Sequence, residues 1–183
     1  ACITIGSIQK GQQIHCEITK EEKESVERAI FLRSNLVYIY ARCGDFIMAE
    51  HVFDSLPIQD VVSWTTLISG YVEYGIGDKA LVCYERMQLQ AISPNIATFV
   101  CSLKACASVR MIGKGQEMHV DIEKKGLLEG DIALGIGLID MYTKCGALDT
   151  AKQVFDKIPT RNVVSWTALI GGYVEHGHAE EAL

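Results

Sequence analysis

Residues 61–75 read VVSWTTLISGYVEYG, and residues 163–177 read VVSWTALIGGYVEHG, 102 positions further along the chain. The same shift relates much more of the sequence, because 23 of the 46 residues from Leu36 to Leu81 are identical to their partners. Self-similarity at a fixed period is typical of proteins built from structural repeats. The sequence therefore predicts a repeat architecture.

A period of 102 residues is too long for one helical hairpin, and the spacing of apolar residues indicates how it divides. Ala151, Val154, Phe155 and Ile158 follow the i, i+3, i+4, i+7 pattern of one helix face, and Pro159 then ends that helix. The same reasoning predicts helices near residues 30–43, 45–56, 62–74, 77–90, 97–108, 112–125, 132–145 and 147–158. Each helix pair has apolar surface that only a neighbouring pair can bury. We therefore expect an all-α fold, a right-handed α-solenoid of stacked antiparallel hairpins.

Composition narrows the class of protein. Hydrophobic residues make up 49% of the 183 positions and charged residues 22%, a balance that excludes disorder. No apolar run is long enough to span a membrane. The seven cysteines are odd in number and lie within helical patterns, which favours a reducing compartment over a disulfide framework. The net charge of −6 argues against non-specific binding of nucleic acid, which normally needs a basic excess.

Residues that could carry catalysis or bind metal have ordinary structural explanations. His178-Ala179-Glu180 matches half of a zinc deaminase signature, but only three residues follow it and the P-C-x-x-C half is missing. Cys101 and Cys106 lie five apart without a second pair of ligands, so we expect buried thiols. We predict no catalytic residue, no metal site and no cofactor.

Several segments closely resemble the plant pentatricopeptide repeat family: VVSWTTLISGYVEYG, ALVCYERMQ, SPN, LIDMYTKCGALDTAKQVFDKIP and GKGQEMH. A tetratricopeptide repeat would instead show a pattern such as W-x2-L-G-x2-Y, which the sequence lacks. Unit lengths of 31, 35 and 36 residues resemble the S, P and L repeats of the P-L-S subclass. The resemblance implies a partial L-type repeat at 1–29, an S-type repeat at 30–60, a P-type repeat at 61–95, an L-type repeat at 96–131, an S-type repeat at 132–162 and a partial P-type repeat at 163–183. We therefore expect a fragment of a longer solenoid.

The resemblance also implies a function. Members bind single-stranded organellar RNA, and the P-L-S subclass mostly selects cytidines for C-to-U editing. The expected role is the specificity module of an RNA-modification factor in the mitochondrion or chloroplast, with any deaminase activity elsewhere. Accessory editing-factor proteins are expected to contact L-type repeats, and no membrane is involved. The alternative is a protein-binding scaffold of tetratricopeptide type, whose groove would hold a peptide.

Repeat proteins of this kind read roughly one base per repeat through two or three side chains. By the resemblance, the fifth residue of the first helix and the last residue of the repeat face the base. The predicted base-reading residues are Ser34 with Asp60, Thr65 with Asn95, Val100 with Asp131, Ile136 with Asn162, and Thr167. At the second position, Phe31, Val62, Ala97, Ala133 and Val164 are expected to make apolar contacts between successive bases.

The chemistry of these pairs predicts which base each one prefers. Ionised Asp only accepts hydrogen bonds, which suits the ring N–H of G or U, whereas Asn both donates and accepts, which suits A or C. In the family a small hydroxyl at the fifth position goes with purines. Ser34/Asp60 is therefore expected to favour G, and Thr65/Asn95 to favour A. Ile136 has no hydrogen-bonding group and departs from the polar residue usual in S-type repeats, which weakens base reading there.

Two further features bear on this hypothesis. Trp64 and Trp166 directly precede the predicted base readers Thr65 and Thr167, and we expect them to pack between repeats rather than to stack on bases. The acidic balance means that RNA binding requires a groove that is itself neutral or basic.

Overall fold

The computed structural model describes residues 26–128, 130–178 and 180, and the burial of side chains from Arg33 onward. It contains the helices α2 (Val26–Cys43), α3 (Phe46–Asp54), α4 (Val61–Glu73), α5 (Gly77–Leu89), α6 (Ile96–Val109), α7 (Ile112–Lys124), α8 (Ile132–Lys144), α9 (Leu148–Lys157) and α10 (Val163–Glu175). These residues include no β-strand. The ends of the eight helices predicted from periodicity lie within four residues of the observed ones.

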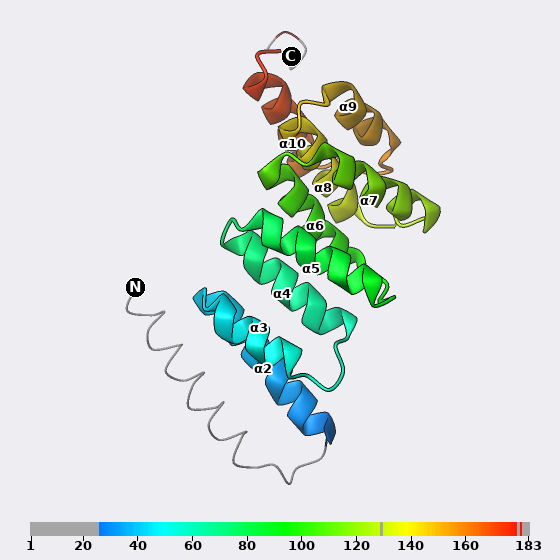
Figure 1. Ribbon diagram of the computed structural model, residues 1–183. Helices are drawn as coiled ribbons and strands as arrows, with labels where there is room; N and C mark the ends of the chain where they lie inside the picture. The colour runs from blue at the N-terminus through cyan, green and yellow to red at the C-terminus, as the bar shows by residue number, and fades with distance from the viewer. Residues whose placement is uncertain (1–25, 129, 179, 181–183) are drawn as a thin grey trace.

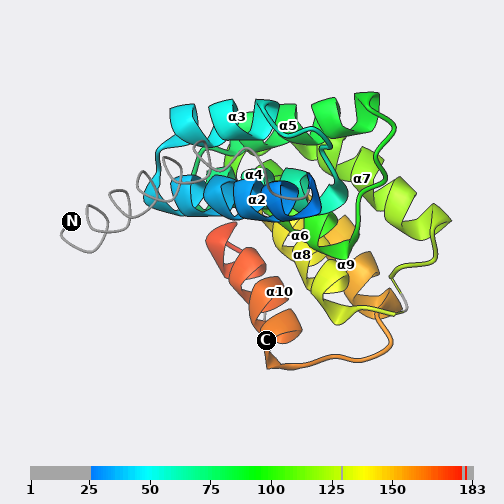
Figure 2. The ribbon, with the colours of Figure 1, turned by 90° about the horizontal axis from the view of Figure 1, so that it is seen from below.

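The helices form two layers (Figures 1 and 2). In one layer α2, α4, α6, α8 and α10 pack successively against each other, and we call this layer the first-helix row. The helices α3, α5, α7 and α9 lie in the second layer, where each packs beside its hairpin partner and against the first helix that follows. The predicted α-solenoid of stacked hairpins is confirmed. Within the described ranges, no helix combines the length and the hydropathy needed to cross a bilayer.

Tight turns inside the hairpins connect the helices of the two layers. Gly44 follows α2 and Gly146 follows α8, with φ of 77° and 78°. This left-handed conformation suits glycine because a Cβ atom would be strained there. The amide of the next residue then donates back into the helix, from Asp45 to the carbonyl of Tyr40 at 3.0 Å. The second helix can therefore begin almost at once.

Close backbone contacts hold the first-helix row together. A Cβ atom added to Gly70 of α4 would lie 2.6 Å from the Cβ of Ala41 in α2. At the position 102 residues later, a Cβ on Gly172 of α10 would lie 2.3 Å from Cγ2 of Thr143 in α8. The repeat therefore preserves a packing geometry that only glycine allows at these crossings.

Aromatic side chains fill the space between repeats. Trp64 is fully buried and meets the ring of Phe53 edge-on, with 4.5 Å between centroids. Trp166 meets Phe155 in the same way at 4.6 Å. The expectation that Trp64 belongs to the core between repeats is confirmed. Trp166 makes the equivalent contact between repeats, although half of its surface is exposed.

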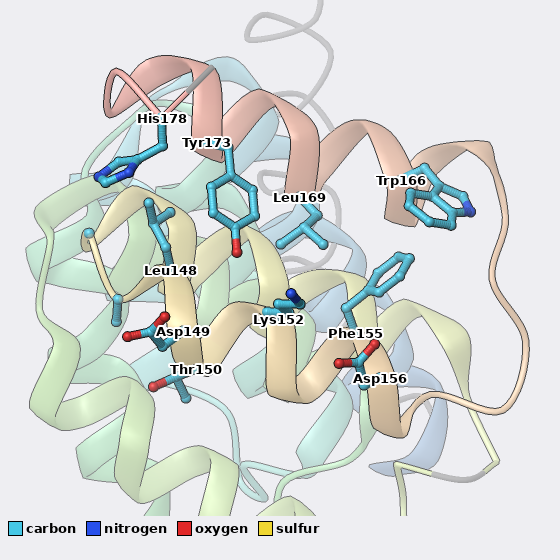
Figure 3. Close-up of a pocket in the computed structure, with 12 residues that line it drawn as sticks. Leu148, Asp149, Thr150, Lys152, Phe155, Asp156, Trp166, Leu169, Tyr173 and His178 are labelled. Atoms are coloured by element: carbon cyan, nitrogen blue, oxygen red, sulfur yellow. The ribbon is translucent and has the colours of Figure 1, made fainter. Parts of the chain in front are cut away.

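The difference between the two tryptophans comes from the helix that covers Trp64. Gln90, which follows α5, accepts a hydrogen bond from the indole of Trp64 at 3.3 Å, and Arg86 lies 5.4 Å from the centre of its ring. Among the described residues no helix takes the place of α5 beside α10. A hollow of about 780 Å³ lies there instead, into which Leu169 and Tyr173 point from α10 toward α9 (Figure 3).

Candidate functional site

The predicted base-reading residues at the repeat ends all lie at the start of a first helix. Each is an N-cap, meaning that its side-chain oxygen accepts a hydrogen bond from a backbone amide in the first turn. The acceptor and donor pairs are Asp60 with Ser63 at 2.8 Å, Asn95 with Thr98 at 2.8 Å, Asp131 with Ala133 at 2.7 Å and Asn162 with Ser165 at 2.9 Å. These four residues therefore fix where the first helices begin.

Sequence reasoning missed this capping role, although the signal was present. In a capping box the N-cap side chain accepts from the amide three residues on, whose own side chain bonds back to the N-cap amide. Here Ser or Thr takes the third position, where Glu or Gln is usual. Asp60 with Ser63 and Asn162 with Ser165 form such boxes, as does Asn95 with Thr98. The serine or threonine of each box is buried, so it supports the site from within the helix start.

Thr65 and Asn95, predicted as one base-reading pair, belong to one hydrogen-bond network. The Thr65 Oγ1 donates to the carbonyl of Val61 at 2.6 Å and lies 2.7 Å from Oγ1 of Thr98. Because Thr65 donates to Val61, the single proton of the Thr98 hydroxyl can go to Thr65 Oγ1 or to Oδ1 of Asn95, which lies 2.9 Å away. The network therefore connects the fifth residue of α4 to the residue that caps α6, although the two are 30 positions apart in the sequence.

The capping bonds determine which side-chain polar groups of the N-cap residues remain available to bind a ligand. In Asn95 the Oδ1 faces the amide and hydroxyl of Thr98, so the Nδ2 donor is left without a hydrogen-bond partner among the described residues. In Asp60 the cap uses Oδ1 and leaves Oδ2 as an acceptor. An amide at a repeat end therefore offers a donor outward, and a carboxylate offers an acceptor.

Two neighbouring hollows along the first-helix row bring many of the predicted residues together. The larger, of about 820 Å³, is lined by Asn95, Ala97, Val100, Asp131 and Ala133, together with other residues. The smaller, of about 440 Å³, is lined by Val100, Ala133, Ile136, Val164 and Thr167, again with others. Val100 and Ala133 belong to both hollows, so the hollows follow one another along the row.

The remaining predicted residues lie elsewhere on the row. Ser34 is half-buried on α2, and Asp60 and Asn162 are exposed where α4 and α10 begin. Val62 is exposed in the first turn of α4. The side chain of Phe31 lies outside the part of the chain whose side chains are described.

Both hollows also contain a lysine that the sequence analysis did not single out. Lys125 lines the larger hollow and Lys104 the smaller. Lys104 lies four residues after Val100 on α6, so helical spacing could have placed it on the same face. Lys125 follows α7, a second-layer helix, and only the packing of the hairpins places it beside Val100.

Cys101, Cys106 and His178, which could suggest a metal or catalytic site, lie in ordinary structural surroundings. Burial raises the pKa of the Cys101 thiol, and it raises that of Cys106 to about 12, so both thiols stay protonated at neutral pH. No group of three or more potential metal ligands occurs in the residues that the structure describes. His178 meets Tyr173 edge-on at 6.5 Å between ring centroids, while Ala179 of the H-x-E sequence lies outside the described residues.

Comparison with protein families gives consistent matches. A profile described as PPR repeat family matches residues 59–108, and one described as PPR repeat matches residues 137–163 and 164–183. Together these matches cover more than half of the chain.

Three relatives from Arabidopsis thaliana are named as pentatricopeptide repeat-containing proteins. One is 36% identical over 100% of this chain and 36% of its own length. A second, named as chloroplastic, is 38% identical over 100% of this chain and 29% of its own length. A third, named as mitochondrial, is 36% identical over 100% of this chain and 28% of its own length. The chain thus spans about a third of the length of these relatives.

Solved structures match the fold. The pentatricopeptide repeat protein PPR10 from maize superposes with a TM-score of 0.71 at 17% identity, covering 93% of this chain and 25% of PPR10. PPR10 in complex with an 18-nt psaJ RNA element gives a TM-score of 0.67 at 19% identity, covering 91% of this chain and 26% of PPR10. At this identity the likeness establishes a shared solenoid fold.

Proposed function

Because this chain belongs to the pentatricopeptide repeat family, we propose that its first-helix row binds single-stranded RNA and reads roughly one base per repeat. The observation that carries the proposal is the pair of neighbouring hollows, each lined by five of the residues predicted to face or flank bases. The RNA-bound structure of PPR10, which has the same fold, supports the choice of ligand.

The P-type repeat at 61–95 is proposed to prefer A. The outward Nδ2 of Asn95 can donate to the N1 acceptor of adenine, and a lone pair of Thr65 Oγ1 can accept from its amino group. Cytosine offers a similar donor and acceptor edge. The preference for A over C therefore rests on the family's association of a hydroxyl at the fifth position with purines.

The S-type repeat at 30–60 is proposed to prefer G. The free Oδ2 of Asp60 accepts the N1–H of guanine but meets a lone pair in adenine, which also disfavours the wrong base. Ser34 supplies the small hydroxyl. Since Ser34/Asp60 and Thr65/Asn95 belong to consecutive repeats, G and A should occupy adjacent positions in the RNA.

The next two repeats are proposed to discriminate less. Val100 and Ile136 give apolar contacts only, so the polar partner alone selects the base: Asp131 favours a ring N–H, and Asn162 favours a ring acceptor.

Thr167 is the fifth-position residue of the repeat that begins at residue 163. The small or apolar second-position residues Val62, Ala97, Ala133 and Val164 would lie between successive bases.

The wider role is proposed from the resemblance to the P-L-S subclass. This chain would choose the site for C-to-U editing while another domain or protein performs the deamination. Relatives named as chloroplastic and mitochondrial support an organellar location. Contact between the L-type repeat at 96–131 and an accessory editing-factor protein rests on the resemblance alone.

Selection from a random library of single-stranded RNA tests the proposal. The chain should enrich sequences that contain adjacent G and A, and it should bind the same sequence far more weakly when it is base-paired. Enrichment of no base pattern would contradict one-base-per-repeat reading. Binding of peptides in place of RNA would favour the protein-binding scaffold.

A further inference from the structure

Two lysines occupy the hollows without a carboxylate partner. Lys104 lies on α6 in the smaller hollow, and Lys125 follows α7 in the larger one. Both side chains are exposed, and the described part of the chain supplies no ion pair to either. An exposed ammonium without an ion pair beside a groove attracts an anion, although Asp131 lines the larger hollow together with Lys125.

The acid that lines the smaller hollow is already paired with another lysine. Asp140 also lines the smaller hollow, but its carboxylate pairs with Lys144 at 3.1 Å. Further toward the N-terminus, Glu73 on α4 pairs with Arg42 on α2. The acid of the smaller hollow is therefore engaged by Lys144 and not by Lys104.

Lys125 is held in place by an aromatic ring. Its Nζ lies 5.3 Å from the centre of Phe99, a distance at which the ring face attracts a cation. Phe99 is buried, so the ammonium is positioned on a rigid surface at the edge of the larger hollow. Such positioning lowers the entropy lost when an anion binds.

We propose that Lys104 and Lys125 bind phosphate groups of the RNA on either side of Val100. This inference rests on the proposed function. Val100 belongs to both hollows and cannot hydrogen-bond a base, so the L-type repeat holds the strand by charge at a position where the fifth residue reads no base. The repeat then acts as a sequence-independent anchor between the repeats that discriminate bases.

Salt dependence of binding tests the proposal. The variants Lys104→Gln and Lys125→Gln remove one charge each, and glutamine is also a good helix former. The probes are single-stranded oligouridines that contain one adjacent pair of G and A, in either order. Each phosphate contact adds about 0.7 to the slope of log affinity against log salt concentration. The factor by which affinity falls between 50 and 200 mM salt should therefore be about 2.6 times smaller for each variant than for the parent chain. Over the same salt range, the loss of affinity of the double variant should be about seven times smaller than that of the parent chain.

Lys79 and Lys124 provide matched controls. Both are exposed lysines on second-layer helices, neither lines these two hollows, and neither has an ion pair among the described residues. Their glutamine variants should keep the parent slope. If Lys104→Gln and Lys125→Gln also keep the parent slope while RNA binding retains its base preference, the phosphate assignment is wrong and the proposed function survives. If the parent chain binds none of these RNAs at 50 mM salt, the proposed function fails and this inference fails with it.

Discussion

The acid or amide at each repeat end caps a helix, and the proposed function gives the same side chain a second task. One oxygen caps the first helix, and the other polar group is left for a ligand, as Asn95 and Asp60 show. The cap also fixes the orientation of the side chain, because Oδ1 must face the backbone amide. A group that is oriented before binding loses less freedom when a base arrives. Helix capping and base discrimination are therefore not independent at these positions.

Replacing Asp60 tests the capping task alone. Asp60→Ala leaves the amide of Ser63 without its acceptor, and the free energy of unfolding should fall by about 1 kcal/mol. Asp60→Asn keeps an oxygen in the same place and should change stability by only a few tenths of a kcal/mol. Urea unfolding followed by circular dichroism measures both variants. Equal stability of Asp60→Ala and the parent chain would show that the capping bond contributes little.

At this scale the sequence predicted the positions of the candidate residues but not the contacts they make. The positions of Thr65 and Asn95 followed from the repeat period and the resemblance. Their connection through the buried Thr98 depends on how α4 packs against α6, which the period does not specify. The sequence analysis treated Asn95 as both donor and acceptor. The cap takes the acceptor, a consequence of the spacing of Asn95 and Thr98 that the sequence reasoning overlooked.

At the scale of elements, the spacing of the first helices is set by glycines at their crossings. Gly70 and Gly172 allow α4 and α10 to approach the preceding first helices closely. Under the proposed function, this spacing determines how far apart successive base-reading positions lie. A solenoid that reads one base per repeat needs a regular step. The step here is therefore a packing property of the first-helix row.

The substitution Gly70→Ala tests this packing. Alanine is the better helix former, yet its Cβ would lie 2.6 Å from the Cβ of Ala41, so α2 and α4 must move apart. We expect a loss of about 1–3 kcal/mol in the free energy of unfolding. Gly113→Ala on α7 is the control, because a Cβ added there would meet no atom within 4 Å, and it should gain about 0.5–1 kcal/mol. Stabilisation by both substitutions would mean that the crossing relaxes freely.

The helices were predictable and the hollows were not. Apolar periodicity and residues such as Gly146 and Pro159 predicted the helix limits, because these signals are local. The larger hollow brings Lys125 of one hairpin beside Asp131 and Ala133 of the next. That arrangement depends on the angle between hairpins, about which a local pattern carries no information.

At the scale of the whole molecule, the net charge of −6 does not describe the first-helix row. The carboxylates of Asp60 and Asp131 lie at helix N-termini, where the helix dipole favours negative charge. Asp140 is paired with Lys144, and Lys104 remains free in the same hollow. An acidic chain can therefore present neutral and basic sites along the surface proposed to bind RNA.

The central claim is that one repeat reads one base, and Asn95→Asp tests it most directly. Asp still caps α6, so the fold and its stability should be retained. The substitution changes the outward donor into an acceptor, which meets the lone pair at N1 of adenine but accepts the N1–H of guanine. Affinities of the parent chain and the variant would be measured for single-stranded RNAs that differ only at the base paired with this repeat. The parent should prefer A and the variant G, each by about 1–3 kcal/mol. A uniform loss of affinity across all four bases, with the melting temperature unchanged, would contradict the claim.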